Sequence, residues 1–384
     1  MTKKLPHYRF QGYTDAWELR KLGEVGAVAM CRRIFKEQTS EIGEIPFYKI
    51  GTFGGTPDAF ISKELFEEYR NKYPYPTKGD ILISASGSIG RTVEFLGKDE
   101  YFQDSNIVWL KHDGKIDNIF LKQFYSIVKW SGVEGSTIKR LYNENILNTE
   151  IALPSLLEQN AIGTFFSILD QQITLHQRKL DTLKEQKKTY LKLLFPAKGQ
   201  TKPVLRFQGF EDDWEEVKLE EVAEKFDNLR VPITASKRIS GNTPYYGANG
   251  IQDYVEGYTH EGEFILIAED GANDLKDYPV QYVNGKVWVN NHAHVIQSVR
   301  NLASNLFLLR AIKTIDIEMY LVGGGRAKLN GDVMMKLPFK LPSLPEQEAI
   351  GTFFQTLDQE IAQVEDKLAS LKEMKKTLLR KLFV

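Results

Sequence analysis

Two long stretches of the chain carry apolar residues at alternating steps of three and four, the spacing of a heptad seam. One stretch follows Pro154 and the other follows Pro342. Each seam continues for about four heptads, so each stretch predicts a helix of roughly 35 residues and about 50 Å that pairs with another helix. The first seam consists of Phe166, Leu169, Ile173, His176, Leu180, Leu183, Lys187, Tyr190 and Leu194. The second consists of Phe354, Leu357, Ile361, Val364, Leu368, Leu371, Lys375, Leu378 and Leu382.

The two stretches are copies of one sequence. The segment 153–195 begins LPSLLEQNAIGTFF and the segment 341–383 begins LPSLPEQEAIGTFF; most of their positions are identical and no gap is needed. A shorter repeat precedes each copy, RFQGYTDAW from Arg9 and RFQGFEDDW from Arg206. The chain is therefore a tandem duplication, which predicts a pseudo-two-fold molecule and not a many-repeat solenoid.

Both helices have a predicted start. Proline disfavours the helical conformation in the residue before it, so the chain is extended up to the two Leu-Pro pairs. Ser155 with Glu158, and Ser343 with Glu346, then have the spacing of a capping box, in which each side chain satisfies an amide at the helix end.

Four residues interrupt the apolar pattern of the helices. Lys187 and Lys375 occupy seam positions, and we expect their stems to follow the apolar face until the ammonium reaches water. Gly163 and Gly351 come early in the helices and favour a close approach of another backbone segment. Each helix could instead pack on its own globular domain. Pairing of the two helices with each other is the simpler arrangement, antiparallel if a two-fold relates the halves.

Two variable stretches lie between the repeated parts, and both read as mixed α/β. Runs typical of strands occupy Ile81–Ser84, Ile107–Leu110, Phe264–Ala268 and His294–Gln297. The predicted domains are a first head with the N-terminal repeated segment, the central helix with its linker, a second head, and the C-terminal helix. Their boundaries are 1–152, 153–203, 204–340 and 341–384.

The composition is that of a soluble globular protein. Of 384 residues, 42% are hydrophobic and 26% are charged. A single cysteine, Cys31, excludes a disulfide framework and a cysteine-built zinc site, and it fits a reducing compartment. The first residues lack the apolar stretch of a signal peptide and no segment has the length of a membrane span, so we expect a cytoplasmic protein.

Each head ends in a basic segment that begins with glycine, 135–140 in the first and 323–328 in the second. Small residues allow a backbone to approach a phosphate, and Arg and Lys contact phosphates or guanine edges. Because the net charge is only −1, DNA binding requires segregated charge or a partner that supplies positive charge. The candidate DNA contacts are Lys49, Arg91, Lys139, Arg140, Lys237, Arg238, Arg326 and Lys328.

Catalytic motifs are missing from the sequence. It contains neither a G-x-x-x-x-G-K-[ST] phosphate loop nor the Pro-Pro pair of amino-methyltransferases, and the glycines of 86–90 are too isolated for a nucleotide cofactor. His292 and His294 could lie on one face of a strand, but no neighbouring carboxylate or cysteine cluster completes a metal set. Residues 269–271 look like a turn and not part of a nuclease centre. We expect no catalysis, no metal and no cofactor in this chain.

These repeats closely resemble those of the specificity subunits of type I restriction–modification systems, over essentially the full length. The resemblance is carried by the RFQG…W segments at Arg9 and Arg206 and by the LPSL-x-EQ-x-AIG-x-FF helices. Three further segments look like parts of target-recognition domains in that family: GDILISASGSIG at 79–90, PYYGANG at 244–250 and WVNNHAHV at 288–295.

The resemblance implies a mechanism. Two target-recognition domains, held apart by a pair of long antiparallel coiled-coil helices, each read half of a bipartite asymmetric DNA site. The helices set the length of the unread spacer. Methylation subunits, typically two, dock along them and use S-adenosylmethionine to methylate adenine N6, and restriction subunits add ATP- and Mg-dependent translocation and cleavage. The expected residues of helix pairing and partner docking are Phe166, Leu169, Ile173, Leu180, Leu183, Phe354, Leu357, Ile361, Leu368 and Leu371.

Two other functions are compatible with the duplicated heads. The chain could be a self-contained DNA-modifying enzyme, against which the missing catalytic motifs count, or a scaffold that joins two protein-binding heads. If the helices measure the spacer, one heptad inserted between Leu180 and Tyr190 adds about 10 Å, close to three base pairs. That insertion is then expected to lengthen the spacer and leave both half-sites unchanged.

Overall fold

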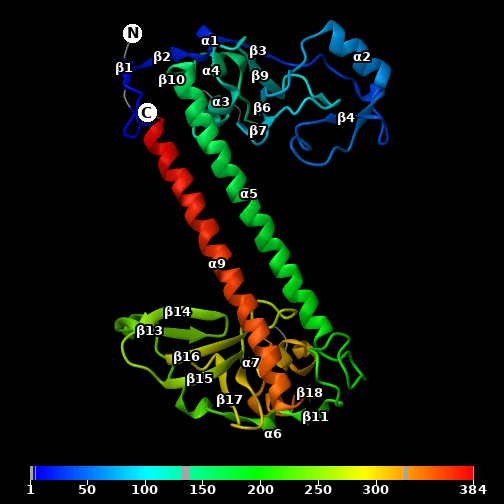
Figure 1. Ribbon diagram of the computed structural model, residues 1–384, viewed down its shortest axis with the longest axis vertical. Helices are drawn as coiled ribbons and strands as arrows, with labels where there is room; N and C mark the ends of the chain where they lie inside the picture. The colour runs from blue at the N-terminus through cyan, green and yellow to red at the C-terminus, as the bar shows by residue number, and fades with distance from the viewer. Residues whose placement is uncertain (1–2, 5, 132–138, 324–326, 384) are drawn as a thin grey trace. The chain divides into compact units, whose positions relative to one another are not determined.

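The fold is that of a computed structural model, which describes residues 3–4, 6–131, 139–323 and 327–383. The chain divides into two compact units, and Figure 1 labels the elements of each. Unit 1 consists of Met1–Gln177 and Lys367–Val384, and unit 2 consists of Arg178–Asp366. Each unit therefore combines one head with the start of one repeated helix and the end of the other. The predicted domain boundaries follow the sequence repeat, whereas the compact units divide both helices.

The head of unit 1 contains three small sheets, of order β3–β9–β6–β7, β5–β4–β8 and β1–β2–β10. Strands β4 and β8 run parallel, and the other pairs are antiparallel. The strands are β1 (Lys3–Lys4), β2 (Trp17–Lys21), β3 (Ala27–Ala29), β4 (Ile45–Tyr48), β5 (Phe60–Ile61), β6 (Ile81–Ser84), β7 (Thr92–Glu94), β8 (Tyr101–Phe102), β9 (Ile107–Lys111) and β10 (Glu150–Leu153). The short helices are α1 (Leu22–Val25), η1 (Lys36–Gln38), α2 (Lys63–Lys72), α3 (Asn118–Tyr125) and α4 (Asn143–Leu147).

The head of unit 2 is built on a six-stranded sheet of order β12–β17–β15–β16–β13–β14, with a separate pair β11–β18. Strands β13 and β16 run parallel and the rest are antiparallel. The strands are β11 (Glu215–Lys218), β12 (Ala223–Lys225), β13 (Ser240–Gly247), β14 (Gly250–Val255), β15 (His260–Ala268), β16 (Val280–Val289), β17 (Ala293–Ser298) and β18 (Pro338–Leu341). The short helices are α6 (Leu219–Val222), η2 (Asp227–Leu229), η3 (Ala235–Lys237), α7 (Asn305–Lys313), η4 (Ile317–Tyr320) and α8 (Gly331–Met334).

All four predicted strand runs are confirmed, as β6, β9, β15 and β17. Their residues are largely buried, because these strands lie in the middle of a sheet between packed layers. Strand β15 begins at His260, before the predicted run, since its first half carries the exposed Glu261 and Glu263 and lacks a continuous apolar pattern.

The two heads share one frame. In unit 1 the backbone N–H of Leu141 donates to the carbonyl of Ala85, just after β6, at 2.8 Å. In unit 2 the N–H of Leu329 donates to the carbonyl of Glu269, just after β15, at 2.7 Å. A helix, α3 or α7, then follows β9 or β17 in each head. The heads differ mainly where unit 1 has β5 and α2 and unit 2 has the long β13–β14 hairpin.

Both predicted long helices are present: α5 (Leu156–Leu193) has 38 residues and α9 (Leu344–Leu382) has 39. Ser155 caps the first, since its hydroxyl accepts the N–H of Glu158 at 3.3 Å. Over the part of the chain that the structure describes, neither these nor any other helix has both the length and the apolar character to cross a membrane.

The glutamate of each predicted capping box has a different role from the one expected. The carboxylate of Glu158 accepts two hydrogen bonds, both 2.7 Å, from the guanidinium of Arg9. Glu346 accepts the same pair from Arg206 at the same distances. Both glutamates are only 1% exposed, so a bidentate ion pair satisfies each buried charge. The repeated RFQG segment therefore fastens the chain to the start of its helix, and the reciprocal capping box is wrong.

Within unit 1 the helices run antiparallel. Lys375 of α9 pairs with Asp170 of α5 at 2.6 Å, and the earlier Lys372 donates to the later Gln177 at 3.3 Å. Asp170 also accepts a hydrogen bond from Gln123 of the head at 3.3 Å. The seam lysine is therefore an ion-pair partner and not, as predicted, a side chain that ends in water.

Unit 2 repeats this arrangement. Lys187 of α5 pairs with Asp358 of α9 at 2.5 Å, and Lys179 pairs with Glu360 at 2.8 Å, which again requires antiparallel helices. Asp358 is also paired with Arg310 of the head. Lysine and aspartate occupy the same places in both copies, so one polar contact fixes the register of the helices in each unit.

The predicted pairing positions are removed from solvent. Ile173 is half-buried, and Phe166 and Leu169 join the core of unit 1 together with Leu371. The buried positions are Phe166, Leu169, Leu180, Leu183, Phe354, Leu357, Ile361, Leu368 and Leu371.

Glycine is required where each long helix crosses the short helix of its head. A Cβ at Gly163 would lie 2.8 Å from the backbone nitrogen of Phe120, and one at Gly351 would lie 2.8 Å from Cβ of Leu306. These distances are shorter than a carbon contact allows, so the two glycines permit the close approach that the sequence predicts.

The end of each repeat closes the opposite unit. In unit 1 the ring of Phe383, after α9, lies 6.4 Å from that of the buried Trp17. In unit 2 the ring of Phe195, after α5, lies 5.8 Å from that of the buried Trp214. The tryptophan of each RFQG…W segment thus packs against the last residue of the other copy's helix.

Candidate nucleic-acid interface

Loops at one edge of the β3–β9–β6–β7 sheet carry half of the predicted DNA contacts. Arg140 lies in an isolated bridge with Ser86, directly after β6, and its guanidinium donates to the carbonyl of Ser105 at 3.2 Å. The guanidinium also lies 5.8 Å from the ring centre of Tyr142. The candidates in unit 1 are Lys49, Arg91, Lys139 and Arg140.

The neighbouring loops bring two more of these cations to the same edge. The guanidinium of Arg91 donates to the carbonyl of Gly54 at 3.4 Å, which joins the loop before β7 to the loop after β4. A Cβ at Gly87, where φ is +64°, would lie 3.7 Å from Ile50, so the loop after β6 touches the same segment. Lys49 immediately precedes Ile50. The structure therefore brings together loops that are distant in sequence.

The remaining facts about these side chains are local. Lys49 pairs with Asp58 at 2.9 Å, and both side chains are exposed. Lys139 is exposed beside Arg140. The preceding part of the basic segment, 135–138, lies outside the described residues.

Lys328 occupies in unit 2 the place that Arg140 has in unit 1. It forms an isolated bridge with Asp270, directly after β15, and its ammonium pairs with Glu269 at 2.7 Å. The matched basic segments of the sequence thus end at equivalent points of the two heads. Arg326 lies outside the described residues.

Lys237 and Arg238 lie elsewhere, before β13. The guanidinium of Arg238 lies 4.1 Å from the ring centre of Tyr245 and pairs with Asp253 at 3.3 Å. Lys237 is exposed at the end of η3. The structure does not bring these two side chains into the loops around Lys328.

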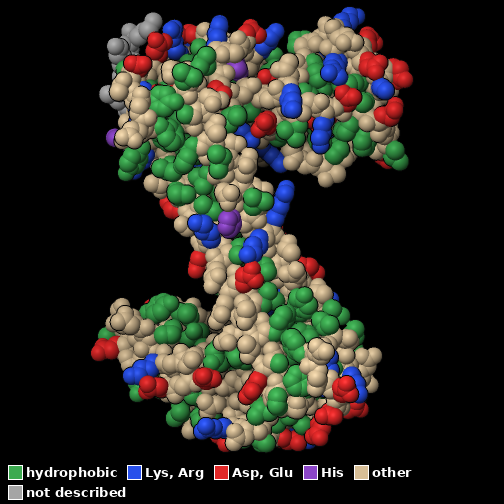
Figure 2. All heavy atoms as spheres, in the orientation of Figure 1, with side chains coloured by type: hydrophobic (Ala, Val, Ile, Leu, Met, Phe, Trp, Pro, Cys, Tyr) green, Lys and Arg blue, Asp and Glu red, His purple; other side chains and the backbone are tan. Residues whose placement is uncertain are grey.

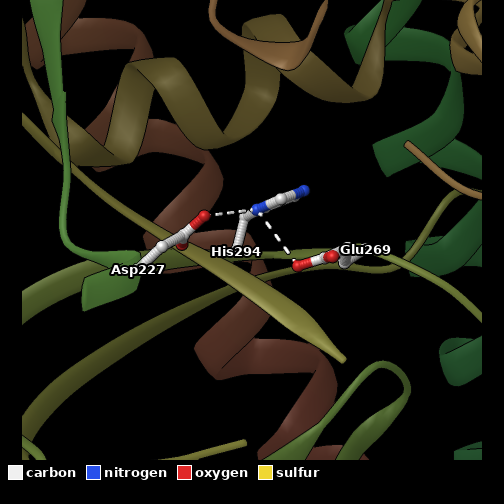
Figure 3. Close-up of side chains that lie close together, drawn as sticks. All are labelled: Asp227, Glu269 and His294. Atoms are coloured by element: carbon white, nitrogen blue, oxygen red, sulfur yellow. Dashed lines mark hydrogen bonds and ion pairs between the residues drawn. The ribbon is translucent and has the colours of Figure 1, made fainter. Parts of the chain in front are cut away.

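A charged cluster lies beside Lys328 in unit 2 (Figure 3). Nδ1 of His294, in β17, lies 2.6 Å from Asp227 of η2 and 3.6 Å from Glu269. Arg230 reaches both carboxylates, at 2.5 Å from Glu269 and 3.4 Å from Asp227. Three cationic groups therefore surround two carboxylates.

The sequence analysis missed these carboxylates as neighbours of the histidine, because Asp227 comes 67 residues before His294. One atom each from Asp227, Glu269 and His294 lie within 4.8 Å of one another, which is close enough to surround a metal ion. However, Nε2 of His294 faces the carbonyl of Leu329 at 2.9 Å while Nδ1 faces Asp227. Only the doubly protonated ring donates to both oxygens, and it has no lone pair for a metal. The arrangement is an ion-pair network.

The network keeps its acidic members ionised. Burial by itself raises the pKa of Asp227 and of Glu269, but the hydrogen bonds and positive charges around them outweigh it and lower both values. For Asp227 the main opposing group is His294, and for Glu269 it is Lys328. The hydrogen bond to Glu269 in turn raises the pKa of Lys328.

The two histidines expected on one strand face have separate environments. Strand β17 starts at Ala293, so His292 belongs to the loop before it. The side chain of His292 is 37% exposed and its Nδ1 lies 2.5 Å from Asp270, whereas that of His294 is 3% exposed. The prediction of one shared face is wrong, since the bend before β17 separates the two rings.

Amide side chains at the same edge of unit 2 were not predicted. Asn249, in the β13–β14 turn, donates to the carbonyl of Gly271 at 2.8 Å and accepts the N–H of Asn273 at 2.9 Å. The amide of Asn290 donates to Gln252 at 3.4 Å. Amides of this kind can bind both acceptor and donor of adenine. The Asn-Gly pair of the hairpin turn was the available signal.

The outer strand of unit 2 exposes apolar side chains. Ile251 and Tyr254 of β14 are 49% and 52% exposed. Figure 2 shows hydrophobic side chains gathered over β13 and β14 on this face. The edge of this sheet therefore offers amide, aromatic and cationic groups to a ligand.

Comparison with known proteins identifies the family. A family model described as the type I restriction modification DNA specificity domain matches residues 14–185 and again residues 211–373. The chain belongs to this family. The two matches coincide with the two copies of the sequence repeat. As a specificity component, the chain is not itself the catalytic subunit.

Two curated relatives agree. The chain is 59% identical, over 156 residues, to a putative type I restriction enzyme specificity subunit of Haemophilus influenzae, S.HindORF215P. That alignment spans 40% of each protein. It is 24% identical to the putative specificity subunit of the type I restriction enzyme MjaX of Methanocaldococcus jannaschii, over 95% of this chain and 92% of the relative.

The fold matches a solved structure. The crystal structure of the S subunit of a type I restriction–modification system from M. genitalium aligns with a TM-score of 0.72 and 18% identity, covering 99% of each chain. At this identity the likeness concerns the fold, which extends over both heads and both long helices.

Proposed function

We propose that the chain recognises a bipartite, asymmetric DNA sequence, one half with each head. The observation that carries this proposal is the equivalent placement of Arg140 and Lys328, each bridged to the loop after the central strand of its head. Cations at this position can hold phosphates, while the neighbouring polar loops face base edges. Because the surrounding loops differ, the two heads are expected to read different half-sites.

The long helices are the spacer ruler in this proposal. An α-helix of 38 residues is about 57 Å long, which corresponds to roughly 17 base pairs at 3.4 Å each. The ion pairs of Asp170 and Asp358 fix the register of the two helices. A fixed register gives a fixed gap between the half-sites.

The catalytic steps belong to partners. Two methylation subunits are expected to dock on the duplicated frame, to bind S-adenosylmethionine and to methylate adenine N6 after flipping the base from the duplex. Restriction subunits are expected to supply ATP- and Mg-dependent translocation and cleavage. A shared clamp explains how a chain of net charge −1 can hold DNA, since the partners add positive charge.

The deciding experiment is a methylome. The chain and the methylation subunit encoded beside it are expressed in a host without DNA methylation, and N6-methyladenine is mapped by single-molecule sequencing. A split motif with two defined halves and a constant gap is expected. The same cells with the methylation subunit alone are the control. A contiguous motif, or no methylation from a soluble complex, contradicts the proposal.

A further inference from the structure

A second apolar stripe follows the outer face of α5 in unit 1. Its positions are separated by alternating steps of four and three, so they lie above one another on one side of the helix. Leu157 is 78% exposed, Ile168 is 54% exposed and Leu175 is 55% exposed. This outer stripe consists of Leu157, Ala161, Thr164, Ile168, Gln171 and Leu175.

The outer stripe lies opposite the face that packs on the head. Ile162, Phe166 and Leu169 form that inner face and are almost completely buried. Folding of unit 1 therefore does not require apolar residues on the outer side. Large aliphatic side chains repeated along an exposed helix face indicate a surface for another molecule.

The second copy of the helix provides an internal comparison. The corresponding positions of α9 are Pro345, Ala349, Thr352, Thr356, Gln359 and Gln363. Alanine, threonine and glutamine are the same in both copies, whereas the three large apolar residues of α5 are replaced. The stripe is thus present twice, once in an apolar form and once in a polar form.

The spacing indicates that the occupant is a helix. Steps of four and three are the pattern that one α-helix presents to another along a shared seam. The first residue of the stripe also opens onto free space, because Leu157 lines a cavity of about 1430 Å³ together with Ile119, Asn160 and residues of the 70–80 loop. A helix along the stripe can extend into this cavity.

The size of the stripe argues against simple self-association. A stable interface contains about 20–30 residues from each partner, and six positions on one helix face supply far fewer. The occupant must therefore hold the chain at other places as well. A methylation subunit fits, since by the proposed function it contacts the duplicated frame, and two copies of it meet the two forms of the stripe.

We propose that the outer stripe of α5 binds an amphipathic helix of the methylation subunit, and that the polar stripe of α9 binds the second copy more weakly. This inference rests on the proposed function. The two methylation subunits of one complex are then unequal, and the copy on unit 1 binds first.

The duplication supplies the variants for the test. Ile168→Thr with Leu175→Gln gives α5 the residues of α9, and Thr356→Ile with Gln363→Leu does the reverse. Thr174→Ala is the matched control, because it also copies an α9 residue into α5 at an exposed position but lies off the stripe. Stepwise dissociation constants are measured by calorimetry and native mass spectrometry, with the full-length chain and the methylation subunit encoded beside it.

The wild-type chain is expected to bind two methylation subunits with constants that differ about tenfold or more. The first double variant should weaken the tighter step about tenfold, the reverse variant should strengthen the weaker step, and Thr174→Ala should change neither. Two binding steps that no variant alters overturn this inference and leave the proposed function intact. No binding by the wild-type chain overturns both. Self-association that Ile168→Thr with Leu175→Gln abolishes would assign the stripe to a second copy of the chain.

Discussion

Glu269 distinguishes the basic segments of the two heads at the level of single residues. Lys328 pairs with it at 2.7 Å, and the lowered pKa of Glu269 keeps that carboxylate ionised at neutral pH. Arg140, at the equivalent place, donates to the carbonyl of Ser105, and in the described part of the chain it has no carboxylate partner. The positive charge of Arg140 is therefore available to a phosphate, whereas that of Lys328 is largely balanced.

This difference predicts unequal contributions to DNA affinity. Arg140→Ala should weaken binding of the assembled methylation complex to its site and reduce the slope of log K against log salt by about one, the value for one lost phosphate contact. Lys328→Ala should change the slope much less. Fluorescence anisotropy at several salt concentrations measures both, with Lys225→Ala on β12 as a surface control. Equal slopes for the two variants would show that Glu269 does not hold Lys328 when DNA is bound.

Residue identity alone predicted the ends of the basic segments but not their environments. Arg140 and Lys328 were found because the duplication aligns them. Lys237 and Arg238 looked equally basic, yet Arg238 is engaged with Tyr245 and Asp253. Contacts of this kind join residues that only the folded sheet brings together, so local sequence carries no sign of them.

The elements were predictable to different degrees for physical reasons. The helices α5 and α9 follow from a seam of regular period, and the strands β6 and β9 follow from continuous burial. Strand β13 was missed: it contains Pro244 and two glycines, residues that normally interrupt a strand. It is tolerated near the edge of the sheet, where only β14 lies outside it.

The pairing of the helices changes how the ruler must be tested. In unit 2 the residues 179–187 of α5 face 358–365 of α9, through Lys179 with Glu360 and Lys184 with Glu365. A heptad inserted in α5 alone leaves seven residues without a partner. We therefore predict that one heptad between Leu180 and Tyr190, together with one at the facing point of α9, lengthens the spacer by about three base pairs.

The methylome of the doubly lengthened variant measures this effect directly. Both half-sites should be unchanged, since neither head is altered. An insertion of four residues in each helix is the control, because it turns the apolar seam away from its partner and should abolish a defined motif. An unchanged spacer in an active heptad variant would exclude the helices as the ruler.

At the scale of the whole molecule, the two compact units have the same composition but are closed differently. In unit 2 the N–H of Leu205 donates to the carbonyl of Leu193 at 2.8 Å, and the linker between them is continuous chain. In unit 1 the N–H of His7 donates to the carbonyl of Lys381 at 3.0 Å. Figure 1 marks the two chain ends there, close together. The same junction is therefore connected in one unit and open in the other.

This equivalence predicts that the connection can be exchanged. A variant in which a linker with the sequence of 196–203 joins Phe383 to the residue before His7, and which is opened between Lys198 and Gly199, keeps every contact described within each unit. Loop closure of this length changes the free energy of unfolding only slightly, since doubling a loop costs about 0.6 kcal/mol. We expect the same far-UV circular dichroism, a melting temperature within a few degrees and an unchanged methylome motif. A variant opened instead between Gly87 and Ser88, within the loop beside Arg140, is the control that should lose recognition of one half-site. Loss of folding in the first variant would mean that the two junctions are not equivalent and that the present order of the halves is needed for assembly.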